Sequence, residues 1–223
     1  MSLVVRTWNL FHGNASPPRR RAYLREMVEL VTADRPAVVC LQELPVWALS
    51  QLERWSGMRA VGAVARRPLL RSAELGRALT ELHHGVLRSA LTGEADAILV
   101  DASFAVAEER ARVVSETGVL RRIAHGLRLD GRIYVVNFHA SARPEELQRA
   151  AELADGEQQV IVAGDANLPA PRLPGFSEPL ADSIDQIYVR GLPAAAPSAW
   201  PEERRRLRGI LLSDHAPVEL AVG

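Results

Sequence analysis

Apolar residues fall into short runs that alternate with amphipathic stretches, so the pattern predicts strands mixed with helices. Strands are expected at 3–10, 37–41, 58–65, 95–101, 104–115, 121–129, 132–139, 158–164, 184–190 and 215–222. Helices are expected at 19–33, 46–55, 72–91 and 145–153. Asp130-Gly131 between two strands is a typical hairpin turn, whereas helices separate other strands. Some connections are therefore hairpins and others crossovers, which indicates an α/β fold with mixed sheets.

Polar residues recur at the points where the predicted strands end. They are Asn9, Glu43, His139, Asp165, Asn167, Asp214 and His215. Strand ends carry their loops to one edge of a sheet, so these side chains could converge there. This recurrence is the main structural clue to a functional site.

Glu43 directly follows the apolar run at 38–41, where a carboxylate is costly unless it is paired, solvated or bound to a cation. A carboxylate oxygen on Mg²⁺ or Mn²⁺ would meet that requirement. Asn9 and Asp214 could supply further oxygen ligands. The alternative is a strand-end acid in solvent or beside an arginine.

The tight turn Gly164-Asp165-Ala166-Asn167 combines an acceptor with an amide, and its glycine allows close backbone approach. Asp165 could position or deprotonate an attacking water, while the Asn167 amide could donate to a phosphoryl oxygen. Asp and Asn are also common turn residues, so the motif alone leaves both interpretations open.

Ser213-Asp214-His215 places an acid beside a histidine. On an extended segment the two side chains point to opposite sides, so one could bind metal while the other carries a proton near neutral pH. Asp185 interrupts an apolar strand and is a plausible partner that fixes the His215 tautomer. His139 could stabilise charge developing on a phosphate.

Composition narrows the function classes. The 223 residues suit one domain spanning 1–223. Zero net charge disfavours a dedicated duplex-DNA binder. The absence of lysine excludes a lysine nucleophile, and the single cysteine excludes an internal disulfide and a thiolate zinc cluster. Without a long apolar run or a signal-like N-terminus, a cytoplasmic protein is expected. The arginine runs and tryptophans are interpreted as surface and packing residues, with phosphate or base contact as the alternative.

Six short motifs occur in a fixed order along the chain. They are Thr7-Trp8-Asn9-Leu10-Phe11-His12-Gly13, Leu41-Gln42-Glu43, Val136-Asn137-Phe138-His139, Gly164-Asp165-Ala166-Asn167, Ile184-Asp185-Gln186-Ile187 and Ser213-Asp214-His215-Ala216-Pro217-Val218. Each is common by itself. Together they resemble the successive motifs of the endonuclease/exonuclease/phosphatase family, which has the deoxyribonuclease I-like fold.

This resemblance implies a four-layer α/β sandwich of two mixed β-sheets flanked by helices, and a divalent-metal-dependent phosphoesterase that uses Mg²⁺ or Mn²⁺. The roles it implies are metal ligands at Asn9, Glu43 and Asp214, water activation at Asp165, phosphate contacts at Asn167 and His139, and a general acid/base couple of His215 with Asp185. The implied reaction is in-line attack of water on phosphorus.

The substrate stays open among a nucleic acid, a phospholipid and a small phosphorylated metabolite, with a small or single-stranded molecule favoured by the neutral charge. Leu44-Pro45 replaces the lysine that abasic-site endonucleases of the family have shortly after the glutamate, which weakens a DNA-repair assignment. His12 and Glu94 are further candidates near the site. The competing hypothesis is a catalytically silent member that acts as a binding module.

Overall fold

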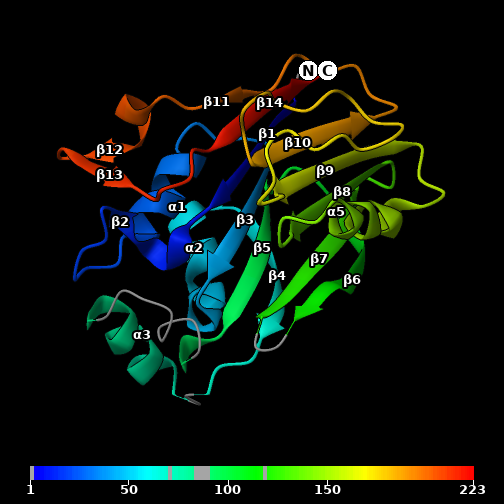
Figure 1. Cartoon of the computed structure of the whole chain (residues 1–223). Helices are drawn as coiled ribbons and strands as arrows, with labels where there is room; N and C mark the ends of the chain where they lie inside the picture. Colours follow the sequence, from blue (N-terminus) through cyan, green and yellow to red (C-terminus); the bar gives the residue numbers. More distant parts are fainter. Residues whose placement is uncertain (1–2, 70–71, 83–90, 118–119) are drawn as a thin grey trace.

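The computed structural model describes residues 3–69, 72–82, 91–117 and 120–223. Two main sheets pack face to face, with helices on their outer sides (Figure 1). The first has the order β11 (Ser198–Ala199), β14 (Val218–Val222), β1 (Leu3–Asn9), β3 (Val38–Leu44), β5 (Glu94–Val100) and β4 (Arg59–Arg66). The second has the order β10 (Asp185–Arg190), β9 (Gln159–Asp165), β8 (Ile133–His139), β7 (Leu120–Leu129) and β6 (Val106–Thr117).

Smaller elements complete the described chain. A third sheet joins β12 (Arg206–Leu207), β13 (Ile210–Leu212) and β2 (Ala15–Ser16). The α-helices are α1 (Leu24–Thr32), α2 (Leu52–Ser56), α3 (Ala73–Leu82) and α5 (Pro144–Ala151). Short 3-10 helices lie at Phe11–Gly13, Val46–Gln51, Glu152–Ala154 and Glu202–Arg205.

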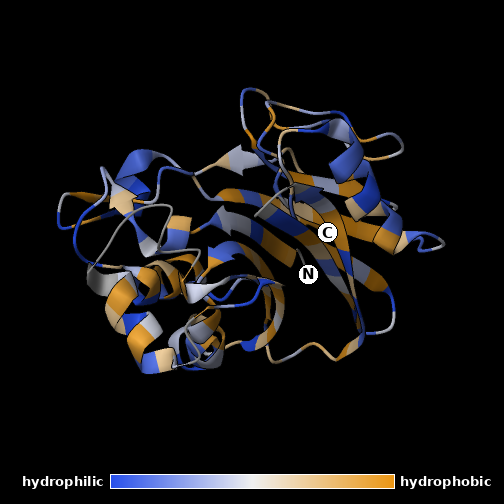
Figure 2. Cartoon of the chain, turned by 60° about the horizontal axis from the view of Figure 1, so that its bottom comes forward, coloured by the Kyte–Doolittle hydropathy of each residue, from blue (hydrophilic) through white to orange (hydrophobic). Residues whose placement is uncertain are grey.

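Three apolar clusters separate the four layers. One lies between α1, α2 and the outer face of the six-stranded sheet, one between the two sheets, and one between the five-stranded sheet and α5. Strand β3 shows the division: Val39 and Leu41 face the helices, whereas Val38 and Cys40 face the second sheet. The continuous apolar run is therefore buried on both faces, as predicted, and strands and helices carry alternating apolar and polar bands (Figure 2). The expected four-layer sandwich is confirmed.

Strand pairing brings the polar strand ends to one rim. β1 pairs parallel with β3 and sets Asn9 opposite Gln42. β8 pairs parallel with β9 and sets His139 opposite Asp165. The predicted Asp130-Gly131 hairpin joins the antiparallel strands β7 and β8, with both turn residues at positive φ. Parallel neighbours end on the same side, which is the physical basis of the expected convergence.

A polar contact between the sheets lies just behind this rim. Asn137 of β8 is fully buried and its amide nitrogen donates to the carbonyls of Leu41 and Ala97, both at 3.0 Å. Its side-chain oxygen accepts from Gln42 Nε2 at 2.7 Å. One side chain of the second sheet is thereby bonded to β3 and β5 of the first.

Several predicted boundaries were wrong. The first helix begins at Leu24 rather than at residue 19, and the segment expected at 46–55 is a short 3-10 helix followed by the short α2. The last strand begins at Val218, so Asp214 and His215 precede it. Residues 83–90 of the helix expected at 72–91, with His83 and His84, lie outside the described residues. Within the described residues, no helix is long and apolar enough to span a membrane.

Candidate active site

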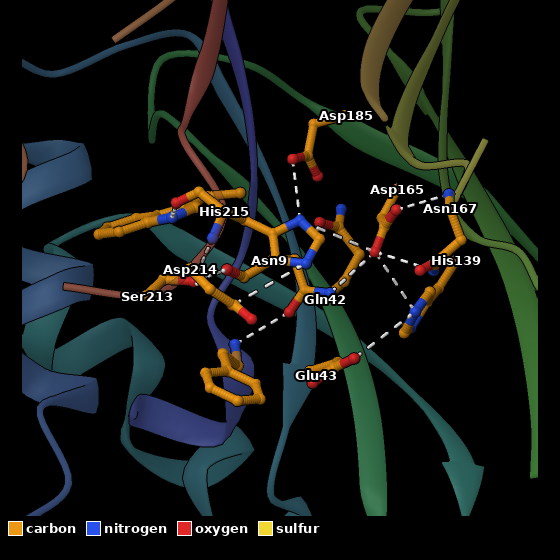
Figure 3. A network of polar contacts seen from close by, with 12 residues as sticks. Asn9, Gln42, Glu43, His139, Asp165, Asn167, Asp185, Ser213, Asp214 and His215 are labelled. Carbon is orange, nitrogen blue, oxygen red and sulfur yellow. Dashed lines mark hydrogen bonds and ion pairs between the residues drawn. The ribbon is translucent and has the colours of Figure 1, made fainter. Parts of the chain in front are cut away.

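The eight residues expected at the site lie around one rim, and their side chains face a common centre (Figure 3). The first members lie at or just after the ends of β1, β3, β8 and β9. The others lie at the start of β10 and in the segment that precedes β14. The set comprises Asn9, Glu43, His139, Asp165, Asn167, Asp185, Asp214 and His215. The structure thus brings together residues from both main sheets.

His215 and Asp185 form a hydrogen-bonded couple. Nδ1 of His215 lies 2.9 Å from Oδ2 of Asp185 and 3.9 Å from Oδ2 of Asp165. Burial by itself would lower the His215 pKa, but the Asp185 hydrogen bond and the charges of Asp185, Asp165 and Asp214 outweigh it and raise the pKa to about 9. His215 is therefore an imidazolium at neutral pH in the ligand-free protein, with Nδ1–H donated to Asp185 and Nε2–H left toward the centre.

Asp165 is fully buried and held by two asparagines. Asn9 Nδ2 donates to Oδ2 at 2.9 Å, and the Asn167 backbone N–H donates to Oδ1 at 2.7 Å. Burial, followed by the nearby Asp185 charge, raises the pKa of Asp165 to about 6. Gly164 precedes it, where a Cβ would lie 1.9 Å from the Phe138 carbonyl oxygen, so the expected close backbone approach is confirmed.

Asn167 is already engaged through its amide nitrogen. Nδ2 lies 3.0 Å from the Ala140 carbonyl oxygen and 3.1 Å from Oδ2 of Asp165. The residue is held at φ 50°, a left-handed conformation that asparagine tolerates. In this state Asn167 orients Asp165, and a bond from its amide to a phosphoryl oxygen requires release of one of these two contacts.

Glu43 faces two imidazoles without touching them. Its Oε2 lies 3.6 Å from Nε2 of His12, and its Oε1 lies 3.7 Å from Nε2 of His139. Among the described residues, these imidazoles are the only basic groups within 4 Å of the carboxylate. Burial raises the pKa of Glu43. Its carboxylate is partly buried, with 17% of the side-chain surface exposed, and it is hydrogen-bonded by Asn9. A partly buried carboxylate of this kind is a suitable oxygen ligand for a divalent cation.

The Asp214-His215 segment departs from expectation. The prediction that the two side chains point to opposite sides was wrong, because Oδ1 of Asp214 lies 3.9 Å from Nε2 of His215. The segment is a turn, in which Ser213 has φ 58° and its hydroxyl donates to the Asn9 carbonyl at 2.8 Å. Asp214 keeps 47% of its side-chain surface exposed, which leaves its carboxylate accessible to a ligand.

Two arginines near the site were missed by sequence reasoning, which interpreted both as members of surface runs. Arg205 is buried and donates to the carbonyls of Ser213 at 2.9 Å and His215 at 3.1 Å, so it holds the turn. Arg122 of β7 pairs with Glu94, and its Nη1 lies 2.8 Å from Nδ1 of His139. No sequence spacing distinguishes either arginine from a surface arginine. Only its buried position in the structure does.

Arg122 decides the state of His139. A guanidinium can only donate, so Nδ1 of His139 accepts and the proton of the neutral ring lies on Nε2. Burial, followed by the charge of Arg122, holds the pKa of His139 well below its usual range. Nε2–H then faces Glu43 and Asp165, with Oδ2 of Asp165 at 3.6 Å.

A second arrangement of metal donors lies in the same rim. Asp165, Asp185 and His215 each offer one ligand atom, and these atoms lie within 4.8 Å of one another. In the described structure, however, His215 Nδ1 is bonded to Asp185, so a cation there would have to replace that bond.

The model of the Endonuclease/Exonuclease/phosphatase family matches residues 7–215. The chain belongs to this family. No curated protein sequence matched. The matched range runs from Thr7 in the first of the six sequence segments to His215 in the last.

Solved structures of other proteins share the fold at low identity. A functionally unknown conserved protein from Enterococcus faecalis V583 has TM-score 0.72 at 16% identity, with 99% of each chain covered. The mannosyl-6-phosphatase Bt3783 of Bacteroides thetaiotaomicron VPI-5482 has TM-score 0.66 at 18% identity, again with 99% of each chain covered. Truncated TDP2 of Caenorhabditis elegans has TM-score 0.67 at 16% identity, covering 100% of this chain and 97% of that chain. At such low sequence identity, the structural similarity to these proteins establishes the fold alone.

Proposed function

We propose that this protein is a divalent-metal-dependent phosphoric ester hydrolase. The observation that carries the proposal is the arrangement on either side of Asp165. The partly buried Glu43 carboxylate lies toward one side, and the His215–Asp185 couple lies toward the other. A cation site and a proton donor then flank one position for water. Membership of a family of nucleases and phosphatases supports the same reaction type.

Asn9, Glu43 and Asp214 would hold Mg²⁺ or Mn²⁺. All three offer oxygen atoms, which these hard cations prefer. The Asn9 side-chain oxygen already accepts the Phe11 N–H at 2.9 Å, which orients it at the rim. A cation bound there would stabilise negative charge on the phosphoryl and leaving oxygens.

Asp165 and His215 would share the proton transfers. Asp165, held by Asn9 and Asn167, orients the attacking water and accepts its proton as the bond from oxygen to phosphorus forms. His215, held at Nδ1 by Asp185, donates its Nε2 proton to the leaving oxygen as that bond to phosphorus breaks. The pKa of His215, raised to about 9, suits it to the donor role at neutral pH.

His139 and Asn167 would contact the phosphoryl group. His139 presents Nε2–H toward the centre because Arg122 occupies Nδ1. Asn167 would exchange its contact with Ala140 or Asp165 for a phosphoryl oxygen. Both groups then donate to oxygens that gain negative charge during attack. The substrate class is left among small phosphorylated metabolites, phospholipids and nucleic acid, with a small or single-stranded substrate favoured by the zero net charge.

The test is turnover by the purified protein with Mn²⁺ on bis-p-nitrophenyl phosphate, a dinucleotide, single-stranded DNA and RNA, a sugar phosphate and phospholipid. We expect turnover that EDTA abolishes and that the near-isosteric Asp165→Asn variant loses by about 10³-fold or more. Metal-independent turnover, or full activity of Asp165→Asn, would overturn the mechanism. Tight Mn²⁺ binding without turnover of any substrate would favour the silent binding module, although every residue of the proposed machinery is present.

A further inference from the structure

Asp96 of β5 is a fully buried acid that the proposed reaction does not use. Its side chain is 0% exposed, and burial raises its pKa well above the usual range. Oδ1 accepts the backbone N–H of Glu43 at 3.3 Å, whereas Oδ2 has no hydrogen-bond partner within the described part of the chain. Burying such a group is costly, so its single contact is of interest.

That contact lies at a break in the pairing of β3 with β5. Leu41 pairs with Ala97 and Leu44 pairs with Ala95, so Gln42 and Glu43 together lie opposite the single residue Asp96. Two residues facing one define a β-bulge, which leaves an N–H outside the regular ladder. Glu43 also has φ 56°, a left-handed conformation that costs free energy in a residue with a side chain.

The bulge reverses the direction in which Glu43 points. Val39 and Leu41 face the outer cluster beneath the helices, so regular alternation would send residue 43 there as well. Instead Leu44 takes the next outer position. Because of the extra residue, the Glu43 side chain points to the rim, where its carboxylate lies 3.7 Å from His139 Nε2 (Figure 3).

We propose that Asp96 is a positioning residue that stabilises this bulge and so directs Glu43 to the cation site. The inference rests on the proposed function, because it takes Glu43 as a metal ligand. Asp96 supplies the acceptor that the bulged Glu43 N–H lacks in the ladder. Its neighbour on the same face of β5, Glu94, pairs with Arg122, which bonds His139. β5 therefore orients two rim residues without itself contacting substrate.

Calorimetric titration of Mn²⁺ into the metal-free protein tests the proposal. Asp96→Ala removes the acceptor and should weaken Mn²⁺ binding by about 10–100-fold, the usual effect of losing a group that orients a ligand. Asp96→Asn keeps an acceptor oxygen and the volume, and should stay within about threefold of the wild type. Val100→Ala is the control for a cavity at an equally buried site of the same strand, in the apolar cluster between the two sheets. It should not change the Mn²⁺ affinity.

The outcomes separate the inference from the proposed function. If the wild type does not bind Mn²⁺, or Glu43→Gln binds it equally well, the metal assignment itself fails. If Glu43→Gln loses binding while Asp96→Ala retains it, Asp96 does not position Glu43. If Asp96→Ala and Val100→Ala lose the same Mn²⁺ affinity, Asp96 contributes only to general stability. If Asp96→Asn loses as much affinity as Asp96→Ala, the charge of Asp96 matters rather than its acceptor oxygen.

Amide hydrogen exchange on the wild type gives a measurement that needs no variant. The Glu43 N–H, bonded to a buried carboxyl, should exchange at least about 100-fold more slowly than the same amide in an unfolded peptide. Exchange at the unprotected rate would overturn the proposed contact even if Asp96→Ala did not fold.

Discussion

Two histidines of the site, His139 and His215, have opposite electrostatic surroundings. Nδ1 of His215 is bonded to the carboxylate of Asp185, whereas Nδ1 of His139 is bonded to the guanidinium of Arg122. Both rings are largely buried, and burial lowers the pKa of each. The partner then decides the result: the His215 pKa rises to about 9, and the His139 pKa stays far below its usual range. Identical side chains thereby become a protonated imidazolium and a neutral hydrogen-bond donor.

Removal of the His215 imidazole, one member of this pair of histidines, should cause the largest loss of activity in the series. His215→Ala should lower kcat/KM by about 10²–10⁴-fold on a dinucleotide, because its alkoxide leaving group needs a proton. The loss should be much smaller on bis-p-nitrophenyl phosphate, whose phenolate leaves without protonation. Steady-state rates on both substrates measure the difference. Equal losses on the two would contradict the donor role.

Asp185→Asn should reduce the difference between the pKa values of His215 and His139, with a loss of activity smaller than that of His215→Ala. Without the carboxylate, the His215 pKa loses its main raising contribution and falls toward its ordinary value of about 6.5, with only Asp165 and Asp214 left to oppose burial. At pH 8 the protonated fraction would then fall well below the roughly 90% that a pKa of about 9 gives. NMR titration of the imidazole in metal-free protein measures this, with Asp182→Asn, in an exposed turn, as the control. A His215 pKa still near 9 in Asp185→Asn would show that Asp185 is not the cause.

The same couple predicts how stability depends on pH. The folded pKa of His215, about 9, lies above the ordinary value of about 6.5, so protonation stabilises the fold. This contribution is fully present below about pH 6.5 and disappears as the pH rises through about 9. Urea unfolding of the metal-free protein measures this. Between pH 6 and pH 9.5 the free energy of unfolding should fall more for the wild type than for His215→Asn. A difference between the proteins that does not change with pH would be inconsistent with this linkage.

Arg122→Met should give the smallest effect of the series. The variant keeps the aliphatic stem but frees Nδ1 of His139, so the ring can change tautomer and no longer holds its proton on Nε2. A loss of about tenfold in kcat/KM is expected, equivalent to one hydrogen bond. Nitrogen-15 shifts of the ring report the tautomer. The double variant Glu94→Gln/Arg122→Met removes the buried unpaired acid, and should recover stability without recovering the tautomer.

Short-range patterns predicted much of the fold and of the site. The apolar run at 38–41 and the Asp130-Gly131 turn were sufficient to place a two-faced buried strand and a hairpin. The polar ends of strands did converge at one rim. These features depend on local alternation and on the rule that parallel neighbours end together.

Other features depend on neighbours distant in the sequence. Arg122 acts on His139 across the β7–β8 pair, and Asp96 contacts Glu43 only because β3 bulges beside β5. The direction of Asp214 was mispredicted because Ser213 turns the chain, with buried Arg205 bonded to its carbonyl. Only the assembled structure shows that Arg122 and Arg205, members of arginine runs, hold site residues in place.

The contact of Asn137 with the opposite sheet has a consequence for how the protein acquires activity. Asn9 and Glu43 belong to one sheet, whereas His139 and Asp165 belong to the other. A shear of one sheet past the other would separate them, and the three hydrogen bonds of Asn137 resist that sliding just behind the rim. Neither sheet carries the whole set of proposed reacting groups. Catalytic competence should therefore arise late in folding, when the two sheets dock, and the onset of turnover should report on that docking.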